Sequence, residues 1–279
     1  MQADIAAARR RFAEDIRAAA PVVHDPRIVE AFARVEREQF LGDGPWMLHP
    51  RAFDRPPVAS PSADPRHVYH DLLISIDDAR GLNSGLPSLW AYYLDKLDIK
   101  PGETLLQVGA GVGYFTAIMA ELVGASGRVI GYEIDAALAT RARAALRGRP
   151  NVEIIAGDAT AVSGLPALDV IVAFAGATHV PEPWLAALAP GGRMAVPFTG
   201  SDGWGFMLRL EDKGGALNAA SLGRCGFYPC GGARSDAEAE ALSAALRGSG
   251  GSPPPLSRME RSDGLQAWYA GDGFRLVAA

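Results

Sequence analysis

The sequence predicts an α/β fold with a doubly wound, mostly parallel sheet. Between residues 104 and 199, short continuous apolar segments alternate with segments of helical periodicity. Strands of this kind are buried on both faces, which is typical of a parallel sheet covered by helices. A glycine-rich turn directly after the first of these strands is a second observation. The alternation stops after Gly200, which indicates a different arrangement beyond that point.

Three regions follow from this pattern. We expect an N-terminal helical and covering segment over residues 1–80, a Rossmann-like core over residues 81–200, and a C-terminal α+β extension over residues 201–279 that packs on the core. A chain of 279 residues is long enough for one large domain with such extensions.

The first twenty residues predict an amphipathic helix. Ile5, Phe12 and Ile16 recur at helical spacing, and the pattern stops at Pro21. We expect this helix to pack on the main body or on a second copy of the chain, so a homodimer through it is one expected arrangement.

The rest of the N-terminal region is less regular. A second helix is predicted to start near Asp25-Pro26, and an irregular covering segment from Gly42 to Pro65 precedes the strand-like run VYHDLLISI. A third helix is predicted to open at Pro87, where a missing N–H costs nothing, with Asn83 or Ser84 as its cap.

The core and the extension are predicted from their apolar patterns. The expected core strands are TLLQV, RVIGYE, VEIIA, DVIVAF and RMAVPF, and the expected core helices are YFTAIMAELVG, AALATRARAAL and PEPWLAAL. In the extension we expect a hairpin around Gly214-Gly215, an alanine-rich helix SDAEAEALSAALRG, a loop GGSPPPLS and a terminal hairpin that turns at Gly271-Asp272-Gly273.

Composition excludes several classes of function. The net charge of −5 comes from 27 basic and 32 acidic residues without long like-charge runs, which argues against a nucleic-acid partner. No apolar stretch is long enough to span a bilayer, and no secretory signal opens the chain, so we expect no membrane partner and a cytoplasmic location. Cys225 and Cys230 cannot form a four-ligand zinc site alone, and no metal is expected.

The strongest motif is the turn G-A-G-V-G at residues 109–113, between a buried strand and a helix. Gly109 and Gly111 let the backbone approach a ligand closely, and Gly113 permits tight packing between strand and helix. Open α/β sheets bind ligands at this end of their strands. Only Val112 separates the last two glycines, whereas the dinucleotide fingerprint has two residues there, so an NAD-dependent oxidoreductase is disfavoured.

Two carboxylates follow at the ends of the next strands. Glu133 ends RVIGYE, where it could accept hydrogen bonds from both ribose hydroxyls of a nucleoside. Asp158, in AGDA, could contact an adenine amino group, and Gly191-Gly192 leads into a further strand. Each of these residues alone could be an ordinary turn residue. Together, in this order, they predict a site for S-adenosylmethionine (SAM).

These residues resemble a class I methyltransferase, and the nearest family is protein-L-isoaspartate O-methyltransferase. The resemblance covers roughly residues 28–200 and includes IVEAFARVEREQF, VYHDLLISI, GAGVGYFTAIMAELVG, GRVIGYEID, NVEIIAGDA and LAPGGRMAVPF. It implies SAM as methyl donor, S-adenosylhomocysteine as product, and a protein, peptide or small-molecule carboxylate as acceptor.

Motif by motif, the resemblance assigns roles to individual residues. The methionine end of SAM would be lined by Gly109, Ala110, Gly111, Gly113 and Tyr114. Glu133 would hold the ribose, and Asp158 with Ala159 would hold the adenine.

The loop from Asp77 to Ser88 would receive the acceptor. Here it reads GLNSGLPS, and alignment on Pro87 places the family's threonine on Asn83, its serine on Gly85 and its histidine on Ser88. Asn83 and Ser84 are therefore the candidate catalytic residues, through contact with the acceptor. The alternative is that they only cap the following helix.

A carboxylate acceptor is already ionised near neutral pH, so alignment and exclusion of water suffice and no general base is required. For an alcohol or amine acceptor a base would be needed, and His179 is the candidate. Arg80 could pair with an acceptor carboxylate or simply be solvated. Two alternatives stay open: a methyltransferase of this fold for a small metabolite or a tailored peptide, and a non-catalytic SAM-binding protein.

Overall fold

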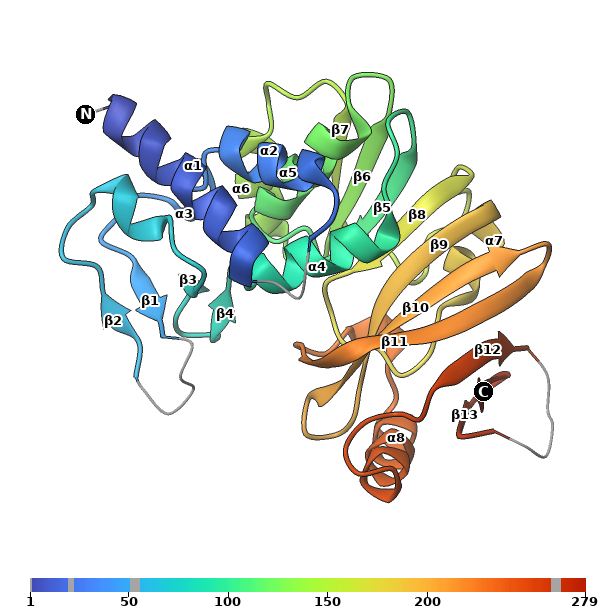
Figure 1. The fold of residues 1–279 in the computed structure, drawn as a ribbon. Coiled ribbons are helices and arrows are strands. Elements are labelled where there is room, and N and C mark those ends of the chain that lie inside the picture. Colours follow the sequence, from blue (N-terminus) through green and yellow to red (C-terminus); the bar gives the residue numbers. More distant parts are fainter. Residues whose placement is uncertain (1, 20–22, 51–55, 262–266) are drawn as a thin grey trace. The chain divides into compact units, whose positions relative to one another are not determined.

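The computed structural model describes residues 2–19, 23–50, 56–261 and 267–279. The chain forms two compact units, and each is described by itself (Figure 1). The N-terminal unit comprises Met1–Gly102, Ala110–Val129 and Asp135–Ile155, and the C-terminal unit comprises Glu103–Gly109, Ile130–Ile134 and Ala156–Ala279. The domain boundaries expected at residues 80 and 200 stay a prediction.

Helix α1 (Gln2–Ala19) is amphipathic and lies beside α2 (Pro26–Arg34) in the N-terminal unit (Figure 1). The ring of Phe12 packs edge-to-face on Phe32 of α2 and on Tyr69, with centroid distances of 6.2 and 5.8 Å. Edge-to-face packing is a favoured geometry for aromatic pairs. The expected packing of this helix on the main body is confirmed, and a homodimer through it stays a prediction.

The second predicted helix is confirmed with its cap. The side chain of Asp25 accepts a hydrogen bond from the Arg27 amide at 2.9 Å, and Pro26 occupies the first turn of α2. The remaining helices of this unit are α3 (Glu38–Leu41), the 3-10 turn η1 (Pro65–Val68), α4 (Pro87–Leu97), α5 (Tyr114–Val123) and α6 (Ala136–Ala145).

A small antiparallel sheet also belongs to the N-terminal unit. Its order is β2-β1-β3-β4, with β1 (Met47–His49), β2 (Val58–Ala59), β3 (Leu73–Asp77) and β4 (Leu82–Asn83). The expectation that residues 42–65 are irregular is therefore wrong in part, because β1 and β2 pair there. Strands of two or three residues are too short to show an alternating pattern. Residues 51–55 of that segment lie outside the described residues.

The C-terminal unit holds a large sheet in the order β13-β14-β12-β11-β10-β9-β8-β5-β6. Strands β5, β8 and β9 pair in parallel, and the strands from β9 to β13 pair antiparallel. Their bounds are β5 (Thr104–Val108), β6 (Arg128–Glu133), β8 (Leu168–Ala173), β9 (Leu188–Thr199), β10 (Trp204–Lys213), β11 (Ala216–Gly226), β12 (Leu256–Glu260), β13 (Tyr269–Gly271) and β14 (Phe274–Ala278). The predicted α/β class with a Rossmann-like parallel core and an α+β extension is confirmed.

Strand β7 (Val152–Ala156) falls largely in the N-terminal unit. There it runs beside the start of β6, where the Val129 amide donates to the Asn151 carbonyl at 2.9 Å and Arg128 pairs with Glu153 at 2.5 Å. Both strands were predicted from their apolar sequences, and both are confirmed.

The extension matches its predicted elements with two additions. The predicted core helix α7 (Glu182–Ala187) forms. In the extension the β10–β11 hairpin, helix α8 (Asp236–Gly248) and the terminal hairpin form, and Ser235 caps α8. A short 3-10 turn, η2 (Gly231–Ala233), precedes α8. Strand β12 was not predicted, because its sequence follows three prolines that indicate a loop. Among the described helices, none combines the length and apolarity that crossing a bilayer requires.

The turn between β5 and α5 depends on Gly113. Its φ is +93°, and a Cβ atom there would lie 2.7 Å from Leu146 Cδ1 and 3.3 Å from Ala142 Cβ, at the end of α6. Gly113 is tightly packed as predicted, but its close neighbours are residues of helix α6 and not the expected strand–helix contact. Gly111 also has positive φ, at +57°, but a Cβ there would meet nothing within 4 Å.

This contrast predicts different costs for two matched substitutions. Gly113→Ala should lower the free energy of unfolding by about 2–4 kcal/mol, because a left-handed backbone conformation adds to overpacking. Gly111→Ala carries only the conformational cost, about 1 kcal/mol. Urea denaturation of the full chain measures both. Equal losses would show that the contact with α6 does not constrain the turn.

Candidate functional site

The glycine turn begins in the C-terminal unit, at the carboxyl end of β5. The amide of Gly109 donates to the Tyr132 carbonyl of β6 at 2.8 Å, and the Phe174 amide donates to the Val108 carbonyl at 2.7 Å. Gly109 adopts a φ of +83°, and a Cβ atom there would lie 3.4 Å from Phe174 Cβ. The chain therefore leaves the sheet in a left-handed conformation that glycine adopts without strain.

The turn continues in the N-terminal unit and opens α5. The Gly113 amide donates to the Ala110 carbonyl at 2.9 Å, and no side chain caps the helix, whose N-cap is Gly113 itself. The first N–H groups of a helix have no partner within it, and they carry a partial positive charge. Such a helix start suits an anionic group of a ligand, such as a carboxylate.

Glu133 and Asp158 lie in the C-terminal unit, at the ends of β6 and just past β7. Glu133 is only 7% exposed, and its backbone carbonyl accepts a hydrogen bond from the Gly157 amide at 2.9 Å. Asp158 Oδ1 accepts hydrogen bonds from the amide and the hydroxyl of Thr160 at 2.8 and 2.7 Å. The Ala159 carbonyl accepts a hydrogen bond from Trp184 Nε1 at 2.8 Å. Asp158 and Ala159, the residues predicted to bind adenine, are therefore held in place by Thr160 and Trp184.

Tyr114, the fifth residue expected at the methionine end, points into the core of the N-terminal unit. Its ring is 2% exposed and packs edge-to-face on Phe32 and Phe40, with centroid distances of 6.2 and 5.7 Å. Burial raises the pKa of its hydroxyl. A part for Tyr114 in cofactor binding would therefore rest on its backbone amide, at the first position of α5.

The loop expected to receive the acceptor is a β-hairpin in the N-terminal unit. Strands β3 and β4 pair through Ser75 and Asn83. At its turn, Arg80 Nε donates to Asp77 at 2.7 Å, and the same guanidinium pairs with Asp135. These hydrogen bonds lower the pKa of both carboxyl groups. Arg80 is thus engaged by carboxylates of its own chain.

The two candidate catalytic residues are held in place by neighbouring groups. Asn83 Oδ1 accepts a hydrogen bond from the Gly85 amide at 3.0 Å. Ser84 is buried, and its hydroxyl oxygen accepts a hydrogen bond from the Ile74 amide at 3.2 Å. Their acceptor role stays a prediction.

The expectation that Asn83 or Ser84 caps α4 is wrong. The N-cap residue is Leu86, which has no side-chain acceptor, and the Ser88 amide donates instead to Asp71 Oδ1 at 2.9 Å. A cap supplied from 17 residues away has no local sequence signal.

Arg37 is the residue that sequence reasoning missed. Its guanidinium is fully buried, and it donates to the carbonyls of Val68, His70 and Leu72 at 2.9 Å each and to Ser84 Oγ at 3.1 Å. The Arg37 side chain therefore links the residues just before strand β3 to Ser84, which follows strand β4. In the sequence, Arg37 is one of several charged residues in VEREQ, and nothing there distinguishes it.

Aromatic rings complete the surroundings of Arg37. The guanidinium carbon lies 5.7 Å from the centroid of Phe12 and 5.6 Å from that of Tyr114. Burial lowers the pKa of Arg37, while the charge of Asp71 is among the groups that oppose this shift. Because arginine stays charged in proteins, this is a buried cation held by hydrogen bonds and by ring faces.

Gly85 shows why the hairpin departs from the resembling family. It has a φ of +75°, and a Cβ atom there would lie 3.0 Å from both Phe115 Cε2 and Trp90 Nε1. The family's serine aligns with this position. A serine side chain would fit here only if these two rings moved. Glycine avoids this contact and also adopts the positive φ without strain.

His179, the candidate base, lies just past β8 in the C-terminal unit. Its Nδ1 is 2.8 Å from Glu238 Oε2, which also accepts a hydrogen bond from the Thr178 hydroxyl at 2.6 Å. Burial alone would raise the pKa of Glu238, but hydrogen bonds from Thr178, from the Asp272 amide and from His179 hold it below its ordinary value. In the parts of the chain that the structure describes, no cluster of three or more His, Cys, Asp or Glu residues suits a metal ion.

Comparison with known proteins gives the chain a consistent set of relatives. Residues 12–235 match the family model described as protein-L-isoaspartate(D-aspartate) O-methyltransferase. The chain is 36% identical over 211 residues to the protein-L-isoaspartate O-methyltransferase of Methanothrix thermoacetophila, which covers 72% of this chain and 90% of that one. It is 32% identical over 228 residues to the enzyme of the same name from Methanopyrus kandleri, which covers 80% and 90%.

Two solved structures share the fold. One protein-L-isoaspartate O-methyltransferase aligns over 90% of this chain and 73% of its own, with a TM-score of 0.65 and 23% identity. A candidate enzyme of the same kind from Plasmodium falciparum, solved with S-adenosyl-L-homocysteine, aligns over 80% and 97%, with a TM-score of 0.62 and 20% identity. At these identities the likeness establishes the fold.

The burial of Arg37 predicts a large cost for its removal. Arg37→Met should lower the free energy of unfolding by about 3–5 kcal/mol, because buried carbonyl groups and the Ser84 hydroxyl lose their donor. Arg10→Met is the matched control, since Arg10 is exposed and forms a surface ion pair with Glu30. Its midpoint of urea denaturation should stay close to that of the unmodified chain. Similar shifts for the two variants would contradict a structural role of Arg37.

Proposed function

The chain belongs to the protein-L-isoaspartate O-methyltransferase family of SAM-dependent carboxyl methyltransferases, and on that premise we propose that it methylates an isoaspartyl carboxylate of a protein or peptide. The observation that carries this proposal is the extent of the match. It runs from residue 12 to residue 235 and so includes both the glycine turn and the acceptor hairpin.

The local geometry suits the cofactor. Gly111 has open space where a side chain would stand, and the uncapped start of α5 offers backbone N–H groups to the carboxylate of the methionine moiety. In this proposal Gly109, Ala110, Gly111 and Gly113 hold that moiety. Glu133 accepts hydrogen bonds from the ribose hydroxyls, and Asp158 with Ala159 binds the adenine.

The chemistry asks for positioning. SAM supplies an electrophilic methyl group; a carboxylate oxygen displaces the sulfur, so that a methyl ester and S-adenosylhomocysteine form without proton transfer. The protein's part is to hold the carboxylate in line with the methyl group and to exclude water. In this proposal the hairpin residues Asn83 and Ser84 hold the carboxylate, and the hydrogen bond from Arg37 keeps Ser84 in place.

A second candidate acceptor is a different carboxylate in a tailored peptide. The packing of Gly85 against Phe115 and Trp90 favours it, because a serine at this position, where the resembling family carries one, would require these rings to shift. The two candidates share the cofactor site and the reaction and differ only in the acceptor.

The acceptor is tested with radiolabelled methyl transfer from SAM to an isoaspartyl peptide and to its aspartyl twin. The proposal predicts base-labile label on the isoaspartyl peptide alone, because methyl esters hydrolyse in base. Label on neither peptide, with SAM binding confirmed in the same sample, would overturn the isoaspartyl assignment and favour the second acceptor.

The cofactor assignment is tested by binding. Glu133→Ala should weaken SAM by about 1–3 kcal/mol, roughly 5- to 150-fold in Kd, because the ribose hydroxyls lose a buried acceptor. Glu153→Ala is the control, since Glu153 pairs with Arg128 at the surface of β7. Isothermal titration measures both. An unchanged Kd for Glu133→Ala would place the ribose elsewhere.

A further inference from the structure

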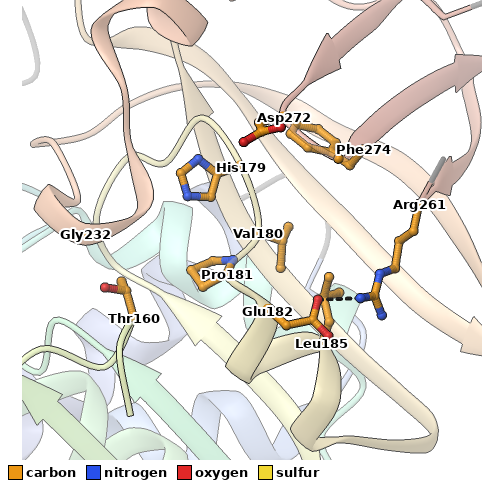
Figure 2. A pocket seen from close by; sticks show the side chains of 11 residues that line it. Thr160, His179, Val180, Pro181, Glu182, Leu185, Gly232, Arg261, Asp272 and Phe274 are labelled. Atoms are coloured by element: carbon orange, nitrogen blue, oxygen red, sulfur yellow. Dashed lines mark hydrogen bonds and ion pairs between the residues drawn. The ribbon is translucent and has the colours of Figure 1, made fainter. Parts of the chain in front are cut away.

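A cavity of about 410 Å³ lies within the C-terminal unit (Figure 2). The loop after β8, helix α7 and the β13–β14 hairpin of the extension all contribute to its walls. This volume is in the range of sites that hold small ligands or side chains. The residues proposed above to bind SAM are not among those that line it, and Thr160 is the nearest to them in sequence.

His179 lines this cavity, and its ring is held in place by Glu238. Glu238 carries a lowered pKa and is ionised, so it accepts the proton of His179 Nδ1 across 2.8 Å. This contact fixes the orientation of the His179 ring at the wall of the cavity. Carboxyl methylation needs no base, so the proposed reaction leaves this pair without a task.

The ionisable groups around the cavity give it an excess of negative charge. Glu182 and Arg261 form an ion pair at 2.5 Å and balance each other (Figure 2). Asp272 lines the cavity from the terminal hairpin, and its backbone amide donates to Glu238 Oε1 at 3.0 Å. The three carboxylates of Glu182, Asp272 and Glu238 therefore outnumber the two basic side chains, those of Arg261 and His179.

The remaining walls are apolar. Val180, Pro181, Leu185 and Phe274 line the cavity beside the polar groups, and the labelled view shows Phe274 next to Asp272 (Figure 2). A long basic side chain matches such a site, because its aliphatic stem lies along apolar surface while its charged end reaches acceptors.

We propose that this cavity binds the side chain of a lysine or arginine residue of the acceptor peptide. The cationic end would donate to the Asp272 carboxylate, with the stem along Phe274. The inference deepens the proposed function, since it names a feature of the acceptor that the C-terminal extension recognises.

The first test measures binding without methyl transfer. The full chain is titrated with the capped peptides Ac-Ala-Lys-Ala-NH2 and Ac-Ala-norleucine-Ala-NH2 and followed by NMR chemical shifts. Neither peptide has a carboxylate, so binding reports on the cavity independently of the proposed reaction. We expect the lysine peptide to bind at least about threefold more tightly, in line with a partly exposed ion pair.

Variants locate the binding. Asp272→Asn should remove the preference for lysine, whereas Asp236→Asn, which removes the same charge from the exposed first turn of α8, should keep it. Equal binding of the two peptides, or a preference that survives Asp272→Asn, would overturn the proposal. Displacement of the lysine peptide by S-adenosylhomocysteine would also overturn it, because the cavity would then belong to the cofactor.

The second test asks whether the cavity serves the acceptor. Isoaspartyl peptides with lysine, norleucine or glutamate at each flanking position are compared in the methyl-transfer assay. We expect lysine at one position to lower KM about threefold or more against norleucine, and Asp272→Asn to abolish the difference. No dependence on lysine at any position would overturn the link to the acceptor. Failure of the proposed function itself would appear differently, as absence of transfer to all of the peptides.

Discussion

The buried guanidinium of Arg37 is the constraint on which the β3–β4 hairpin, proposed above to receive the acceptor, depends. It satisfies three backbone carbonyls before the hairpin and the Ser84 hydroxyl after it. A buried cation is expensive unless its hydrogen bonds are made, so the segments around it have little freedom to move independently. Tyr114, the first residue of α5, lies against the same guanidinium. One side chain therefore joins the hairpin to the helix that starts at the glycine turn.

This arrangement explains how family membership and an altered hairpin sequence coexist. The residues proposed to bind the cofactor lie at strand ends and at glycines with positive φ, within the part of the chain that matches the family. The end of the hairpin is held by the hydrogen bond from Arg37 to Ser84 and by the packing of Gly85 close to Trp90 and Phe115. Asn83 and Gly85, which differ from the residues of the resembling family, lie within these supported segments. In the proposed function, specificity for the acceptor can change at these positions while the reaction stays the same.

Sequence reasoning recovered the fold, because the elements of its core have local signals, whereas the cofactor residues that it named stay a prediction. Apolar runs marked the strands of the core, and Asp25-Pro26 and Gly124 marked helix ends. The contacts that hold the acceptor hairpin had no such signal. The cap of α4 comes from Asp71, the partner of His179 is Glu238 on a helix 59 residues away, and Arg37 reads as one charge among many. Each of these depends on residues that meet only after the chain has folded.

Hydrogen exchange of individual amides in Arg37→Lys tests most directly whether Arg37 fixes the hairpin. The amides of Ile74 and Ser84 bond across the hairpin, to Ser84 Oγ and the Ile74 carbonyl. Ile171 and Val172 of β8 serve as a reference in the other unit. The account predicts that exchange at Ile74 and Ser84 accelerates at least tenfold while the β8 amides keep their rates. Unchanged protection at Ile74 and Ser84 would contradict it, and so would equal acceleration in both places, which would indicate global destabilisation.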